Sequence, residues 1–220
     1  MGFRIATNTQ SLAAQRSLGL TNDAQKRSLE KLSAGERIVR AGDDAAGLAI
    51  SEKLKAEIRS NRQANRNAND GISLVQTAEG CLNEIQNILI RLRELSMQSA
   101  TDTIGDTERG FTDKEVQNLV AEVQRIAATT QFNGRYLLNG SGEVLEFQVG
   151  THNIPEQDRL VYNTAMTDVT TAKLGLQELT VMNKDAAQGN LDILDKAINA
   201  VSENRSEFGA LQNRLQSTIN

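Results

Sequence analysis

The sequence predicts a mainly α-helical protein, an elongated antiparallel helical bundle or coiled-coil rod with a small β-hairpin region. Among 220 residues there are only five Phe, two Tyr and no Trp, whereas a thick core normally contains aromatic side chains that bury roughly 150–250 Å² each. The single Pro leaves little to interrupt helices. Apolar residues also recur at helical spacing over several long segments. These observations favour thin helical packing over a thick globular core.

Residues 1–40 are predicted to form an amphipathic segment with a narrow apolar stripe. Few helix breakers precede Gly35, and the apolar positions are widely spaced: Ile5, Leu12, Leu18, Leu29, Leu32 and Ile38. Such a stripe can bury little surface on its own. We therefore expect the segment to be disordered in a free subunit until a partner covers the stripe.

A long helix is predicted from Ala45 to about Ala100, after a turn at Ala41 and Gly42. Asp43 or Asp44 is placed to cap it, because a carboxylate can accept hydrogen bonds from free N–H groups at the positive helix end. At about 1.5 Å per residue an uninterrupted helix would be roughly 80 Å long. A coiled-coil-like seam is formed by residues spaced three, four or seven apart: Ile72, Val75, Leu82, Ile85, Leu89 and Leu92.

A second helix is expected from about Asp113 to Thr129, after a polar break from Thr101 to Gly110. Its apolar stripe has helical spacing, at Val116, Leu119, Val120, Val123, Ile126 and Ala127. The stripe predicts that this helix packs against another helix.

Short β structure is expected in the region that follows. Asn133-Gly134 and Asn139-Gly140 are turn dipeptides. Apolar residues then alternate with polar ones from Leu145 to Val149, which is the period of a half-buried strand, and Arg159 to Tyr162 could supply a partner strand. Residues 151–182 are otherwise mixed, so the β-hairpin region is placed at about 137–182.

A last helix is predicted from about Asp185, and it should lie along the long helix. Leu194, Val201, Phe208 and Leu215 are seven residues apart, a spacing that keeps them on one face. The sequence stops inside this periodic segment, which leads to the expectation that it is part of a longer chain.

Several function classes are disfavoured. One Cys and one His make a disulfide framework or a Cys/His zinc site implausible. The sequence has no phosphate loop, dinucleotide fingerprint, HExxH or CxxC motif, so we expect no enzyme activity, no cofactor and no metal. No stretch approaches 18 apolar residues, and we expect no membrane partner.

Charge is unevenly distributed along the chain. Residues 1–66 contain 12 Lys and Arg against 7 Asp and Glu, and residues 67–220 contain 12 against 21. The basic part has no run of five Lys or Arg, and Phe3 is its only aromatic residue, whereas base stacking needs several. We therefore expect no nucleic-acid partner, and we interpret the basic part as a solvated or self-associating helix face.

Taken together, several segments resemble bacterial flagellins. The similarity includes NTQSLAAQRSLG near the start, LEKLSAGERIVRAGDDAAGLAISEKLKAEIR at 29–59 and RLRELSMQSAT at 91–101. It continues in AEVQRIAATTQFNGRYLL at 121–138, LEFQVG at 145–150 and FGALQNRLQSTI at 208–219. The resemblance covers both flanks and most of the middle of the chain.

The resemblance implies a structural subunit of the flagellar filament that self-assembles for motility. Residues 1–42 would be the N-terminal arm of the inner tube, and residues 43–220 the helical rod domain with its β-hairpin region. Only about 25 residues connect LEFQVG with KLGLQELTV, which implies that outer variable domains are absent. The partners implied are other flagellin subunits and the flagellar export and chaperone machinery. The implied location is the extracellular filament, reached by type III export without a cleaved signal peptide.

Four residues are candidates for receptor or axial contacts because of this resemblance: Arg91, Leu95, Glu115 and Leu119. In many flagellins the matching surface is bound by the flagellin-sensing Toll-like receptor. An anchoring Arg flanked by an apolar Leu, with a carboxylate nearby, suits a small polar hot spot. Leu119 departs from the pattern, because flagellins that are recognised well usually have Arg there. These residues could equally serve axial contacts between subunits.

A second departure concerns the C-terminus. Flagellins continue by some 50 residues or more beyond the segment that matches LQNRLQSTI, so the C-terminal inner-tube helix is expected to be absent and this chain is not expected to build a normal filament. Two alternatives stay open: a hook–filament junction protein, which shares the terminal helical pattern, and a coiled-coil adaptor module. The close match of GERIVRAGDDAAGLAISEKL and TQFNG favours flagellin.

Overall fold

The computed structural model describes residues 8–219, so the first seven residues of the predicted arm, including Ile5, lie outside the described part. The chain divides into two compact units between Arg59 and Ser60, a position inside the long helix α2 (Ala45–Ser99). The first buried residue of α2 is Ala64, five residues after this division. The division at 42/43 that the family resemblance implies concerns the assembled protein and stays a prediction.

The first unit contains helix α1 (Thr9–Ala34), which has clear boundaries. Asn8 caps its start, because the side-chain oxygen accepts the N–H groups of Gln10 and Ser11, both at 3.1 Å. Gly35 ends it with a φ of +66°, a left-handed conformation that glycine adopts without steric cost. No described residue of α1 is buried. That this segment is disordered in a free subunit stays a prediction.

The two aspartates before α2 have separate roles. The Oδ1 atom of Asp44 accepts the N–H of Gly47 at 2.9 Å, so the predicted capping of α2 is confirmed for Asp44. The Oδ2 atom of Asp43 accepts the N–H groups of Val39 and Arg40, each at 3.4 Å. The bond to Val39 is the main cause that lowers the pKa of Asp43. Asp43 therefore orders the linker and leaves the cap to its neighbour.

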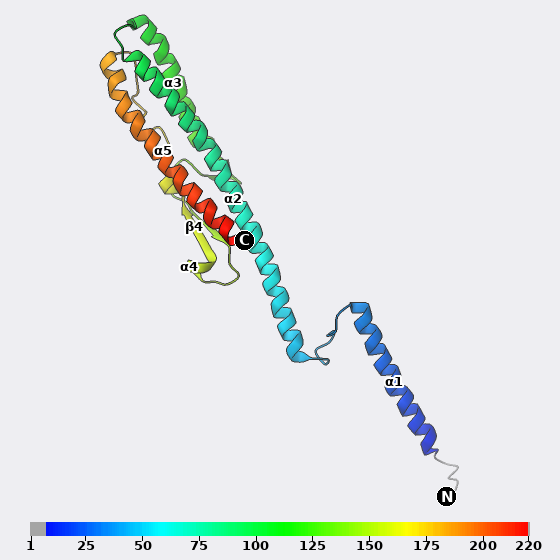
Figure 1. Ribbon diagram of the computed structural model, residues 1–220. Coiled ribbons are helices and arrows are strands. Elements are labelled where there is room, and N and C mark those ends of the chain that lie inside the picture. The colour runs from blue at the N-terminus through cyan, green and yellow to red at the C-terminus, as the bar shows by residue number, and fades with distance from the viewer. Residues whose placement is uncertain (1–7, 220) are drawn as a thin grey trace. The chain divides into compact units, whose positions relative to one another are not determined.

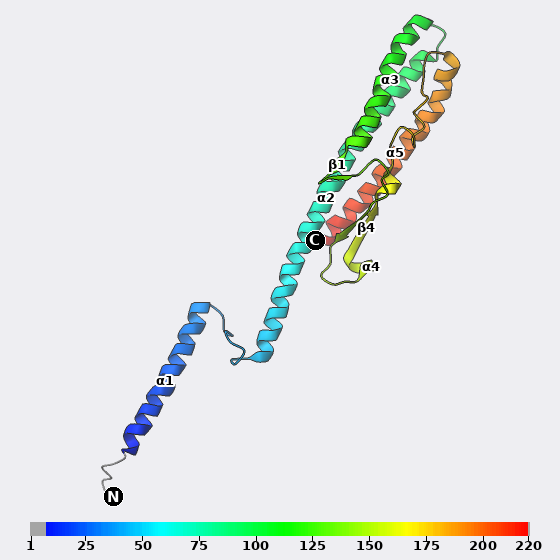
Figure 2. The ribbon, with the colours of Figure 1, turned by 180° about the vertical axis from the view of Figure 1, so that it is seen from behind.

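The second unit is built on α2, which packs against α3 (Asp106–Thr129) and α5 (Lys184–Ile219). Figures 1 and 2 show that α3 and α5 lie beside α2 and run antiparallel to it. The predicted seam of α2 is buried apart from the half-buried Ile72, and all four residues of the heptad series in α5 are fully buried. The sequence pattern therefore predicted the core of the bundle.

Helix α3 begins at Asp106, seven residues before the predicted start at Asp113. The polar run had indicated a break, but Asp106 and Glu108 place acidic groups in the first turn, where the positive helix end favours them. The guanidinium of Arg109 donates to the carbonyl oxygens of Ser99 at 3.1 Å and Thr101 at 2.9 Å. The first turn of α3 thus satisfies carbonyl groups at the end of α2.

The β structure consists of two antiparallel pairs. Strands β1 (Gln131–Phe132) and β2 (Arg135–Tyr136) flank the predicted Asn133-Gly134 turn and lie before the expected region 137–182. Strand β3 (Val144–Gln148) pairs with β4 (Arg159–Asn163), as predicted, with Leu145 opposite Tyr162. Between and after them are the short helix α4 (Pro155–Asp158) and the 3₁₀ turn η1 (Thr164–Thr167). Figures 1 and 2 show β4 beside the C-terminal half of α5.

The segment 168–182, which has no regular helix or strand, is held along α3 by three polar side chains. Gln124 accepts the N–H of Thr171 at 3.0 Å, and Gln117 donates to the carbonyl of Leu179 at 2.8 Å. Asp113 accepts the N–H of Val181 at 2.8 Å. Because these bonds replace a ladder with a neighbouring strand, the segment can bury apolar residues without being a regular element: Val169, Leu174, Leu176, Leu179 and Val181.

Candidate protein–protein contact surface

An ion-pair cluster joins α2 and α3 on the surface of the second unit. The Nε atom of Arg91 donates to Glu115 Oε1 at 3.0 Å, and its Nη1 atom donates to Glu94 Oε2 at 3.1 Å. The hydrogen bond with Glu115, followed by that with Glu94, raises the pKa of Arg91 above its ordinary value. Half of the Arg91 side chain is still exposed. The Arg91 guanidinium is therefore fixed by two carboxylates and is still accessible to a second molecule.

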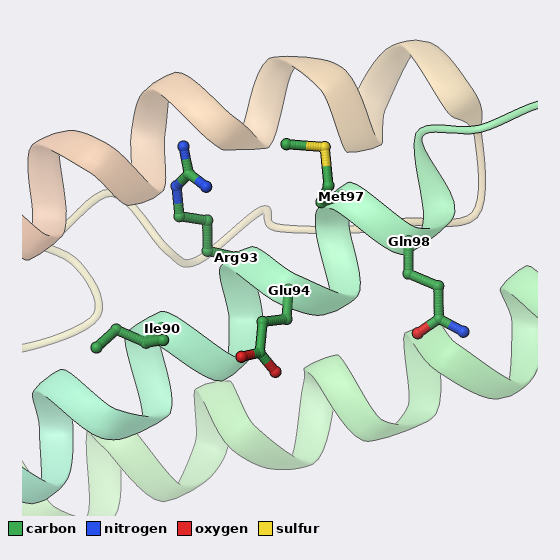
Figure 3. Close-up of a pocket in the computed structure, with 5 residues that line it drawn as sticks. All are labelled: Ile90, Arg93, Glu94, Met97 and Gln98. Carbon is green, nitrogen blue, oxygen red and sulfur yellow. The ribbon is translucent and has the colours of Figure 1, made fainter.

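A shallow groove of about 430 Å³ lies beside this cluster, on the exposed face of α2. Figure 3 shows five of its residues: Ile90, Arg93, Glu94, Met97 and Gln98. Ile90 is 44% exposed and Met97 is 51% exposed. We call Ile90, Arg91, Glu94, Met97 and Gln98 of α2, with Glu115 of α3, the Arg91 surface. It combines Arg and Met, which are enriched at protein interfaces, with the exposed carboxylates of Glu94 and Glu115.

The other two candidates from the sequence lie deeper. Leu95 is 2% exposed and belongs to the core of the bundle. Because the Leu95 side chain is covered, Leu95 can support a contact only indirectly, by fixing the part of α2 that carries Arg91. Leu119 is half-buried and packs at the edge of the same core. It follows Glu115 by one helical turn, so the two lie on one side of α3.

Two features of this region were not predicted from the sequence. Arg93 forms a double hydrogen bond with Asp195 of α5, at 2.7 and 3.3 Å, and this bond lowers the pKa of Asp195. Ile90 and Met97 were also missed. Their spacing of seven residues, outside the buried seam, was the signal that could have identified a second apolar stripe.

Within residues 8–219, no cluster of three or more His, Cys, Asp or Glu residues is arranged to hold a metal ion. Over the same residues, no helix combines the length and apolar character that crossing a bilayer requires.

The antiparallel bundle of long helices, with exposed apolar side chains on its surface, is the architecture of a helical structural protein. Residues 5–143 match the family described as "Bacterial flagellin N-terminal helical region". The chain is 42% identical to a flagellin of Halalkalibacterium halodurans over 96% of this chain and 77% of the relative. It is 39% identical to a flagellin of Bacillus subtilis over 99% and 81%. The chain therefore belongs to the bacterial flagellin family.

The solved structures agree with this assignment. The crystal structure of Bacillus cereus flagellin, at 29% identity, covers 71% of this chain and 88% of its own with a TM-score of 0.63. A putative flagellar hook-associated protein of Vibrio parahaemolyticus has a TM-score of 0.62 over 82% and 92%, but only 14% identity, so it shows the fold alone. Flagellin is thus favoured over the junction protein. The chain is a non-enzymatic structural subunit of the extracellular flagellar filament, and it serves motility.

Proposed function

We propose that the Arg91 surface is the place where successive subunits contact one another along the filament of the bacterium that produces this chain; that the 220 residues alone build no normal filament stays a prediction. The observation that carries the proposal is the fixed Arg91 guanidinium, whose partner Glu94 lines the same shallow groove as the exposed Ile90 and Met97. Arg is enriched at the energetic centres of protein interfaces, where surrounding apolar groups exclude water. In a free subunit these groups face solvent. A neighbouring subunit would bury them.

Bonds between helices fix the side chains around the Arg91 surface before any partner binds. Arg91 and Glu115 come from different helices, and Arg93 connects α2 to α5. The side chains are therefore fixed with respect to three helices that share one core. A contact surface that is already ordered loses less conformational entropy when a partner binds. This favours repeated addition of identical subunits.

The first test is an Arg91→Ala substitution in the bacterium that produces this chain. We expect shorter or fewer filaments in electron micrographs and reduced swimming, because the substitution removes the charged centre of the contact. Arg125→Ala is the matched control: Arg125 is also an exposed Arg, on α3, and its one ion-pair partner among residues 8–219 is Glu122 of its own helix, at 2.8 Å. Filaments of normal length in the Arg91 variant would contradict the proposal. So would equal losses in both variants.

A second proposal concerns recognition by the flagellin-sensing Toll-like receptor, for which the same exposed surface is the candidate. Leu119 occupies the position where well-recognised flagellins usually have Arg, so Leu119→Arg should strengthen activation of the receptor by the soluble chain. The half-buried site can accommodate this change, since an Arg stem can cover apolar surface while its charged end reaches water. The measurement is a dose–response curve in receptor reporter cells. An unchanged or weaker response, with unchanged far-UV circular dichroism, would contradict the proposal.

We further propose that the chain leaves the cell through the flagellar export apparatus, with the help of its chaperones and without a cleaved signal peptide. We also propose that the N-terminal arm, residues 1–42, becomes ordered only on assembly. The exposed leucines of α1 support ordering on assembly, because an assembled neighbour would cover side chains such as Leu12 and Leu32, which are 56% and 79% exposed. N-terminal sequencing of the secreted protein tests the absence of cleavage, and we expect the N-terminus to be intact. Slow amide exchange in α1 of the free subunit would contradict the proposed ordering.

A further inference from the structure

Two Asn-Gly dipeptides of the second unit have the same chemistry but different surroundings. At an Asn-Gly bond the backbone nitrogen of glycine can attack the side-chain carbonyl carbon of the preceding asparagine, because glycine has no side chain to hinder the approach. Asn133-Gly134 connects β1 to β2, and Asn139 of Asn139-Gly140 lies five residues before β3 begins at Val144. A difference in reaction rate between the two dipeptides in the folded chain therefore reflects their structural surroundings.

Asn133 is free to react. Both residues of its dipeptide are exposed, and among the described residues no hydrogen bond involves the Asn133 amide or the Gly134 N–H. A Cβ atom added to Gly134 would have nothing within 4 Å, so the turn has space to rearrange. Asn133 is also the only described non-glycine residue with a positive φ, +49°. The left-handed region costs energy for a residue with a side chain, although Asn tolerates it better than most.

The strands on either side do little to hold this turn closed. Strands β1 and β2 have two residues each, with the pairs Gln131–Tyr136 and Phe132–Arg135, and one further bond at the end away from the turn runs from the N–H of Leu137 to the carbonyl oxygen of Thr130 at 3.2 Å. Two ladder pairs add little stability of their own, and the exposed turn at their end, where contacts are few, is the part of the hairpin that opens most readily. Local opening therefore gives the Gly134 nitrogen access to the Asn133 side chain without unfolding the bundle.

Asn139 is restrained instead. Its Oδ1 atom accepts the N–H of Ser141 at 3.1 Å. Gly140 lies against Asp168, whose carboxyl carbon would be 2.7 Å from an added Cβ atom. The two preceding residues, Leu137 and Leu138, are fully buried, and Leu138 accepts the N–H of Val169 at 3.1 Å. Rearrangement at this dipeptide would disrupt the core, and the packing protects it.

We propose that Asn133 is a site of spontaneous modification in the folded protein, at which the amide is converted to a carboxylate. The Gly134 nitrogen forms a bond to Asn133 Cγ, the bond from Cγ to Nδ2 breaks, and ammonia leaves with the proton that the Gly134 nitrogen loses. Water then opens the cyclic imide at either carbonyl, which gives an aspartyl or an isoaspartyl residue. No oxidant, metal or enzyme takes part.

The modification changes the surface beside the hairpin. A new negative charge appears in a groove of about 410 Å³, next to Arg135 and Glu146. An isoaspartyl linkage also adds a backbone methylene to a two-residue turn, which cannot keep the register of β1 and β2. Phe132, which lines the same groove, would lose its fixed position. Subunits in an extracellular filament would accumulate this change with age.

The test is to age the intact folded chain in mildly alkaline buffer and to follow both sites by peptide mass spectrometry and isoaspartyl detection. The same chain unfolded in urea is the reference, because it removes the structural difference while keeping the local sequences. We expect the ratio of the Asn133 rate to the Asn139 rate to be several-fold higher in the folded chain. A folded ratio equal to or below the unfolded ratio overturns the proposal.

Asn133→Gly provides a second, independent measurement. Glycine accepts the positive φ of the turn and has no amide to convert. We expect this variant to lose most of the acidic species that the folded chain accumulates on ion exchange, while the rate at Asn139 stays unchanged. Accumulation equal to that of the unsubstituted chain would overturn the proposal.

Discussion

Phe208→Ala is expected to lower the free energy of unfolding of the second unit by about 3–5 kcal/mol. The Phe208 side chain is fully buried, and its ring lies 5.0 Å from that of Tyr162, centroid to centroid. Removing it leaves a cavity where α5 meets β4, and the loss also affects Tyr162, whose pKa is raised by its burial. In a protein with five Phe, few other side chains can fill such a space. Urea unfolding followed by circular dichroism is the measurement.

Phe111→Ala is the matched control for this prediction. Phe111 is 65% exposed on α3, and Lys114 lies over its ring at 5.9 Å. An exposed cation–π contact contributes less than about 1 kcal/mol, so the midpoint of unfolding should change little. A loss in the Phe111 variant equal to that in the Phe208 variant would show that the core is not where the structure places it.

Replacing glycine with alanine should have opposite effects at two positions. At Gly150 a Cβ atom would overlap the Asp158 side chain, with only 2.7 Å to its own Cβ atom. Asp158 cannot move away freely, because its Oδ2 atom accepts the N–H of Ile154 at 2.9 Å and its carbonyl accepts that of Val149 at 2.8 Å. Gly150→Ala is therefore expected to destabilise the second unit by about 1–3 kcal/mol.

Gly80→Ala is expected to stabilise the same unit by about 0.5–1 kcal/mol. Gly80 lies inside α2, is exposed, and has nothing within 4 Å of an added Cβ atom. The substitution thus adds helix propensity without a clash. Both variants can be compared by urea unfolding at unchanged slope. Equal signs at the two positions would contradict the described environments of Gly80 and Gly150.

The parts of this fold that could be predicted are those in which periodicity alone determines the structure. The helix predicted from Ala45 to about Ala100 is observed as Ala45–Ser99, and the heptad series of the last helix is buried. Strand alternation similarly predicted the pairing of β3 with β4. In each case an apolar stripe has one possible partner surface, so the local pattern and the tertiary packing agree.

The missed parts depend on contacts between segments that are distant in sequence. The start of α3 is fixed by the acidic first turn and by Arg109, which bonds to the end of α2. Segment 168–182 is shaped by Asp113, Gln117 and Gln124 of α3, and polar residues on a helix do not reveal in the sequence which backbone groups they bind. Arg91 was predicted as a contact residue from the family resemblance and not from the spacing of residues in the sequence. Its ion pair with Glu115 became visible only in the structure.

We propose that this flagellin assembles through the Arg91 surface. The most direct measurement is cryo-electron microscopy of filaments isolated from the bacterium that produces the chain. We predict that the α2–α3–α5 bundle is the repeating unit and that the Arg91 guanidinium, Ile90 and Met97 are buried against the next subunit. A filament in which these three side chains face solvent would contradict the account.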